Sequence, residues 1–188
     1  MRLFRSLTLL LTLAVPSVYA DDLYQVEMIL VRQNAVPAIV SRAAPEDWDA
    51  GARRISPDSL RTPSLNGEVE KLTASNEYTV LLHKAWQQTL GEEVSRVAIS
   101  DGKEQFGQFP IEGTLSIKQG RFTDVDADFW VNQINPDGLV TASERLKTDS
   151  HTKNGQLNFL DAGHLGLLIK ITSLTAPAPR PVPEEIPD

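Results

Sequence analysis

The chain has 188 residues, no cysteine and a formal net charge of −7 at pH 7. The absence of cysteine excludes disulfides, thiolate metal sites and a lipid-modified N-terminal cysteine. The acidic balance gives no general electrostatic attraction toward nucleic acid or an anionic membrane, and we expect no nucleic-acid partner. The length suits one domain with a hydrophobic core, which we expect over residues 21–175.

The first 20 residues have the pattern of a secretory signal peptide. Arg2 and Arg5 are followed by an apolar run at residues 7–15 and then by a candidate cleavage site at Val18-Tyr19-Ala20. The run is shorter than the roughly 20 residues that span a bilayer, which disfavours the alternative of an uncleaved anchor. We therefore expect export, cleavage after Ala20 and no membrane span in the mature protein.

A strand is predicted at residues 24–33. Apolar side chains recur there at every second position: Tyr24, Val26, Met28 and Leu30. The second half of this strand is apolar on both faces, which favours an interior position in a sheet.

Residues 34–76 form a long Pro-rich segment. Four prolines forbid a long helix or a central strand there. We expect a surface excursion that is disordered or variable, with one short helix at residues 64–75 whose N-cap is Ser64.

The centre of the chain, residues 111–131, is predicted to form a β-hairpin. The inward positions are Ile111, Gly113, Leu115, Ile117, Val125, Ala127, Phe129 and Val131. The outward positions of the second strand are Asp124, Asp126, Asp128 and Trp130. A three-residue connection at 119–121 sets Leu115 opposite Val125, whereas a two-residue connection would place an aspartate against the core.

Further strands are predicted at residues 77–88, 92–100, 141–153, 156–161 and 165–171. The last is nearly all apolar and should lie centrally, and Asn154-Gly155 predicts a two-residue hairpin turn. The Pro-rich residues 176–188 should form a disordered tail. The expected fold is α+β, a mainly antiparallel β-sheet built from hairpins with one or two short helices.

The sequence motifs predict no metal site, cofactor or catalytic residue. A helix-loop-helix calcium site fails at Phe129 and Asn135, where Gly and Glu are needed. His83, His151 and His164 have no zinc-binding spacing, and nucleophile elbows and phosphate loops are absent. A pair of carboxylates for sugar hydrolysis stays open, because such residues can lie far apart in sequence.

The row of aspartates beside Trp130 is the candidate recognition surface. Three like charges on one strand face are either solvated, paired with Lys or Arg of a neighbouring strand, or used to hold a ligand. An indole beside carboxylates suits a neutral or amphoteric glycan. The alternative is that the 34–76 excursion covers Trp130.

Four blocks of the chain resemble the CsiV family of exported proteobacterial proteins. They are YQVEMILVRQ, YTVLLHKAWQQ, IEGTLSIKQGRFTDVDADFW and QLNFLDAGHLGLLIKIT. The resemblance implies a periplasmic, non-catalytic peptidoglycan-binding adaptor that supports cell-wall synthesis and cell shape. It implies peptidoglycan as ligand, and a penicillin-binding protein or its lipoprotein activator as protein partner. The alternative is a protein–protein regulator of envelope assembly without glycan affinity.

The resemblance, together with the strand pattern, selects eight candidate binding residues. They are His83, Trp86, Gln87, Arg121, Asp126, Asp128, Trp130 and Asp161. The family has histidine where this chain has Asp124, so the chain resembles a divergent member.

Overall fold

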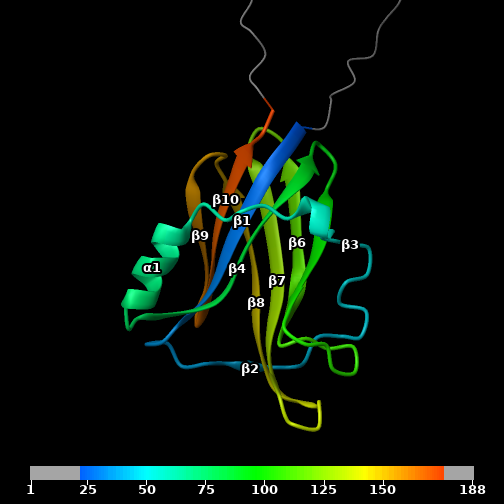
Figure 1. Ribbon diagram of the computed structural model, residues 1–188, viewed down its shortest axis with the longest axis vertical. Coiled ribbons are helices and arrows are strands. Elements are labelled where there is room, and N and C mark those ends of the chain that lie inside the picture. Colours follow the sequence, from blue (N-terminus) through cyan, green and yellow to red (C-terminus); the bar gives the residue numbers. More distant parts are fainter. Residues whose placement is uncertain (1–21, 176–188) are drawn as a thin grey trace, which may run out of the picture.

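The computed structural model describes residues 22–175, which form two β-sheets (Figure 1). The expected signal peptide with its cleavage after Ala20, and the expected tail at 176–188, lie outside the described residues. Sheet A has the order β4-β1-β10-β9. Its strands are β1 (Asp22–Gln33), β4 (Tyr78–Leu90), β9 (Leu157–Ala162) and β10 (Leu165–Ser173).

Sheet B has the order β2-β8-β7-β6-β5-β3. Its strands are β2 (Val40–Ser41), β3 (Arg53–Arg54), β5 (Ser95–Asp101), β6 (Ile111–Gln119), β7 (Thr123–Ile134) and β8 (Val140–Thr152). All described pairings are antiparallel except that of β3 with β5. With one α-helix and one short 3-10 helix, this confirms the predicted fold class.

The main core lies between the two sheets. The inward-facing side chains of the strands form this core, among them Met28 of β1, Phe129 of β7 and Leu167 of β10. β1 and β10 both have a neighbour on each side, which confirms their predicted interior positions. Because successive side chains point to opposite faces, the remaining residues of each strand form an outer face on each sheet.

The predicted hairpin of β6 and β7 is present, but its register differs by two residues. Leu115 lies opposite Ala127 rather than Val125. The connection has three residues, at 120–122 instead of 119–121, and the Gly120 amide donates to the Phe122 carbonyl at 2.9 Å. A two-residue shift keeps every side chain on its face, so the predicted faces still hold.

The predicted hairpin at Asn154-Gly155 is wrong. The strands on either side of it, β8 and β9, belong to different sheets. Gly155 has φ +76°, but among residues 22–175 Phe106 is the only non-glycine residue with positive φ. A two-residue hairpin turn of type I′ requires positive φ at both central residues. The chain instead crosses from sheet B to sheet A here, and the Gly155 amide donates to the Ile171 carbonyl of β10 at 2.7 Å.

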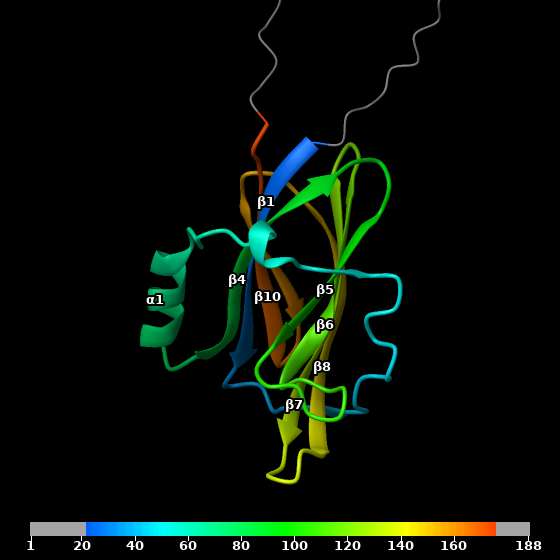
Figure 2. The same cartoon turned by 45° about the vertical axis from the view of Figure 1, so that its right-hand side comes forward.

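The Pro-rich segment lies against both outer faces instead of being disordered. Figure 2 shows the helix α1 (Asn66–Ala74) beyond sheet A and the cyan part of the segment beyond sheet B. The segment also contains β2, β3 and the 3-10 helix η1 (Pro57–Ser59). The helix was predicted, but Ser64 is not its N-cap: the N-cap is Leu65, without a side-chain hydrogen bond. Within residues 22–175, no helix has the length and apolarity needed to cross a membrane.

Candidate functional site

The structure places the eight candidate residues in separate regions. Trp86 points into the main core and is 1% exposed, so it is not a surface residue. Its indole donates to the Gln88 side chain at 2.8 Å. Arg121 lies in the β6–β7 connection, and its guanidinium is 5.7 Å from the Phe122 ring. Trp130 lies seven residues beyond Thr123 on β7, about 23 Å at the rise of a strand, so Arg121 is remote from it.

Three further candidates lie on or beside sheet A, and their side chains are engaged by other residues of the protein. His83 Nε2 is 2.8 Å from Glu27 Oε1, and the Gln87 side chain accepts a hydrogen bond from Arg61. Asp161 accepts from the Gln33 side chain at 2.9 Å and from the Gly163 amide at 3.0 Å. These positions do not converge with Trp130, which lies on sheet B.

Asp126, Asp128 and Trp130 do share one surface, the outer face of sheet B. The acids alternate outward as predicted, since Val125, Ala127 and Phe129 are buried in the main core. Trp130, however, is 5% exposed, so the prediction that it faces solvent is wrong. It packs with Ala44, Trp48 and Ala98 beneath the Pro-rich segment, which was the alternative left open.

Arg145 of β8 connects the aspartate row to Trp130. Its guanidinium donates to both carboxylate oxygens of Asp128, at 2.8 and 2.7 Å, and lies 4.6 Å from the Trp130 ring centroid. The hydrogen bonds to Asp128 raise the pKa of Arg145 above its ordinary value. Such a two-point ion pair fixes the guanidinium plane, here over an aromatic ring.

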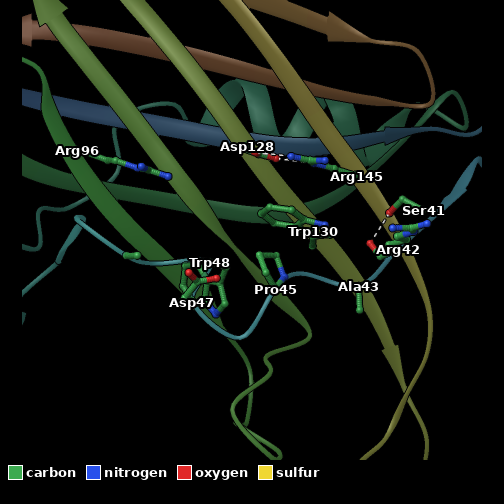
Figure 3. A pocket seen from close by; sticks show the side chains of 11 residues that line it. Ser41, Arg42, Ala43, Pro45, Asp47, Trp48, Arg96, Asp128, Trp130 and Arg145 are labelled. Atoms are coloured by element: carbon green, nitrogen blue, oxygen red, sulfur yellow. Dashed lines mark hydrogen bonds and ion pairs between the residues drawn. The ribbon is translucent and has the colours of Figure 1, made fainter.

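A pocket of about 630 Å³ opens between this face and residues 41–50 (Figure 3). Its volume falls within the range of small-ligand sites. It is lined by Ser41, Arg42, Ala43, Pro45, Asp47, Trp48, Ala50, Arg96, Asp128, Trp130 and Arg145. Three arginines, two aspartates and two indoles thus come together from the Pro-rich segment and three strands of sheet B.

A smaller hollow of about 300 Å³ lies further along the same face. It is lined in part by Asp124, Asp126, Asp149 and His151, and His151 Nδ1 lies 2.5 Å from Asp124 Oδ1. Asp126 and Asp149 are directly opposite each other on β7 and β8. Within the part of the chain that the structure describes, no group of three or more acidic, histidine or cysteine residues is arranged to hold a metal ion.

The sequence reasoning missed the arginines of the larger pocket. One available signal was Arg145 with Lys147 at every second position of the strand that follows the aspartate row, a complementary cross-strand pattern. Arg42 and Arg96 carried no comparable signal, because they come from distant parts of the chain.

We expect the Asp128→Asn variant to lose about 1 kcal/mol of unfolding free energy, because the charged two-point pair with Arg145 becomes a weaker neutral contact. The Asp128 side chain is 17% exposed and that of Arg145 is 38% exposed, so solvent screening limits the loss. Urea unfolding monitored by tryptophan fluorescence measures it.

Asp126→Asn is the matched control, two residues away on the same strand face. Asp126 is exposed and faces the like charge of Asp149, so its neutralisation should leave stability unchanged or slightly higher. Equal losses in both variants would contradict a specific role for the Asp128–Arg145 pair.

These features define a cysteine-free, two-sheet β domain with an ionic pocket over an indole floor. A family described as "Peptidoglycan-binding protein, CsiV" matches residues 2–62 and 50–174. The chain belongs to this CsiV family, which confirms the resemblance found in the sequence. No curated protein and no solved structure matches the chain.

Proposed function

We propose that this protein is a periplasmic, non-catalytic peptidoglycan-binding protein and that the polymer binds at the pocket of Figure 3. The family supports the choice of ligand. One observation carries the location: the pocket unites an apolar floor with charged groups on a single face. A polymer of amino sugars and short peptides offers both kinds of partner, since it has apolar ring faces, amides and carboxylates.

We further propose that the bound protein acts as an adaptor for cell-wall synthesis and cell shape. Its protein partner would be a penicillin-binding protein or that enzyme's lipoprotein activator. A protein that binds both the polymer and a synthase raises the effective concentration of the synthase at its substrate without forming new contacts to the reacting groups. This role requires a protein-binding surface separate from the pocket.

The second candidate is a protein–protein regulator without glycan affinity. Trp86 and Trp130 cannot form its contact surface, because both are buried. Another surface favours it: Ile39 and Val40 are exposed at the short edge strand β2, where an apolar side chain has no packing role. Crosslinking from these two positions would identify a partner that binds there.

We expect the mature chain to sediment with purified sacculi, and Ala43→Tyr to reduce the bound fraction severalfold. Ala43 is exposed and lines the pocket, so a phenol ring there would occupy space that the polymer needs. Co-sedimentation over a range of sacculus concentrations measures the apparent affinity.

Ala74→Tyr is the matched control. It places the same ring at an exposed position of α1, on the other side of the molecule. Recovery of the native chain no better than that of an unrelated acidic periplasmic protein would refute direct wall binding. Release of new soluble fragments from the sacculi would refute the non-catalytic part of the proposal.

A further inference from the structure

The charges of the pocket are only partly balanced within the protein. Arg145 is paired with Asp128 through two hydrogen bonds, and Arg54, which does not line the pocket, is paired with Asp49 at 2.7 Å. Among the residues that the structure describes, neither Arg42 nor Arg96 forms an ion pair with a carboxylate. Both side chains are exposed at the pocket, and Arg96 donates one hydrogen bond, to the Thr114 hydroxyl at 3.1 Å.

These two arginines make the pocket locally cationic. Asp47 supplies one carboxylate at the pocket that also has no basic partner among the described residues, so the two guanidinium groups exceed it by one charge. The whole chain carries a net charge of −7, so a general attraction for anions is absent. A locally cationic pocket on an acidic protein therefore favours binding of an anionic group at the pocket rather than over the whole surface.

The indole floor is covered, which removes ring stacking as the main source of affinity. Trp48 and Trp130 are each 5% exposed, and the Arg145 guanidinium lies over the Trp130 ring. A sugar ring would therefore find little exposed indole surface to stack on. Among the basic groups that line the pocket, Arg42 and Arg96 are the two without a carboxylate partner in the described residues.

We propose that the pocket recognises the carboxylate-bearing peptide stem of peptidoglycan, with Arg42 and Arg96 as its contacts. This inference rests on the proposed function. Figure 3 shows Arg96 and Arg42 on opposite sides of Trp130, so an acidic peptide lying across the floor can present one carboxylate to each. Guanidinium groups pair with carboxylates through two parallel hydrogen bonds, which makes arginine suited to this ligand.

Competition for sacculus binding tests the ligand class. The probes are a synthetic stem tetrapeptide with free carboxylates, the same tetrapeptide with its carboxylates amidated, and a neutral chitin tetrasaccharide. We expect the acidic tetrapeptide alone to displace the full mature chain from sacculi, and its effect to weaken as salt rises. Displacement by the saccharide or the amidated peptide, without displacement by the acidic one, would overturn the proposal while leaving peptidoglycan binding intact. Displacement by the acidic and amidated peptides alike would also overturn it, because charge would then be irrelevant.

Substitution of the arginines tests the contacts. We expect Arg42→Gln and Arg96→Gln each to weaken sacculus binding about tenfold, the loss of one charged hydrogen-bonding contact. Arg53→Gln is the control, since Arg53 is also an exposed arginine but lies outside this pocket. Unchanged binding in the double variant Arg42→Gln/Arg96→Gln would overturn the assignment, whereas failure of the native chain to bind sacculi would overturn the proposed function itself.

Discussion

Gly113→Ala is expected to lower the unfolding free energy by about 3 kcal/mol, because overpacking a close backbone contact is among the costly core substitutions. Gly113 of β6 lies opposite Phe129 of β7. A Cβ added there would collide with the Asp128 carbonyl oxygen and come within 2.5 and 2.6 Å of Phe129 Cδ1 and Cα. Two of these three atoms are backbone and cannot rotate away, so the strands themselves would have to separate. Urea unfolding gives the loss as a shift in the midpoint.

Two other glycines calibrate this prediction. Gly67 in α1 has nothing within 4 Å of an added Cβ, so Gly67→Ala should raise stability by roughly 0.5–1 kcal/mol through its better helix propensity. At Gly166 the added Cβ meets only the ring of Phe159 closely, at 2.5 Å, and that ring is 48% exposed. It can swing outward, so Gly166→Ala should cost about 1 kcal/mol. If Gly113→Ala lowers the unfolding free energy no more than Gly166→Ala does, the prediction is contradicted, because β6 and β7 would then separate at little cost in free energy.

Alternation along the strands was sufficient to predict the faces of the central hairpin, and it was insufficient to predict its register. The two-residue alternation specifies which side chains point inward. A shift of the strand register by any even number of residues leaves that assignment unchanged. Leu115 therefore faces the core as predicted while pairing with Ala127 instead of Val125. The turn decides between such registers, and Gly120 to Phe122 carried no strong turn signal.

The exposure of the tryptophans could not be predicted, because it depends on segments remote in sequence. Trp130 lies on an outward position of β7 and would be exposed if sheet B stood alone. Residues 41–50 cover it, and the burial of Trp48 beside it holds that segment in place. The high proline content correctly excluded a long helix, but it carries no information about whether an irregular segment packs against a sheet.

Only the part of the candidate site that lies on β7 was predictable. The aspartates of β7 follow from local alternation, whereas the three arginines of the pocket come from the Pro-rich segment, β5 and β8. Their convergence requires the order of strands in sheet B, and local patterns do not fix that order. The candidates chosen by family resemblance are likewise spread over both sheets, and the binding role of each stays a prediction.

Glu27→Ala is expected to cost about 4 kcal/mol, because it leaves one buried and three part-buried donors without their acceptor. Glu27 of β1 is 1% exposed. Its carboxylate accepts from the Ser64 amide at 2.8 Å, the Leu65 amide at 2.8 Å and the Ser64 hydroxyl at 2.6 Å. His83 Nε2 must donate the fourth bond, at 2.8 Å, since a carboxylate can only accept.

This arrangement replaces the helix cap that was predicted at Ser64. The carboxylate comes from the neighbouring sheet and lies at the N-terminal end of α1, where a negative charge is favourable. One side chain of β1 therefore holds the start of the helix against sheet A. Amide hydrogen exchange should show α1 losing protection in Glu27→Ala while β10 keeps most of its own. Glu70→Ala, an exposed change on the same helix, should alter stability by less than about 0.5 kcal/mol.

The same contacts predict how this contribution depends on pH. Burial alone would raise the pKa of Glu27, but the hydrogen bonds from Ser64, Leu65 and His83 outweigh it and lower the pKa below its ordinary value. A carboxyl group with a lowered folded-state pKa stabilises fully above its unfolded-state pKa, about 4.3, and loses that stabilisation as the pH falls through the folded-state value. The difference in unfolding free energy between the native chain and Glu27→Gln should therefore shrink as the pH falls below about 4. Comparing the two chains cancels the other acidic groups, so a difference that stays constant down to pH 3 would mean that the ionised form of Glu27 is not what holds the helix.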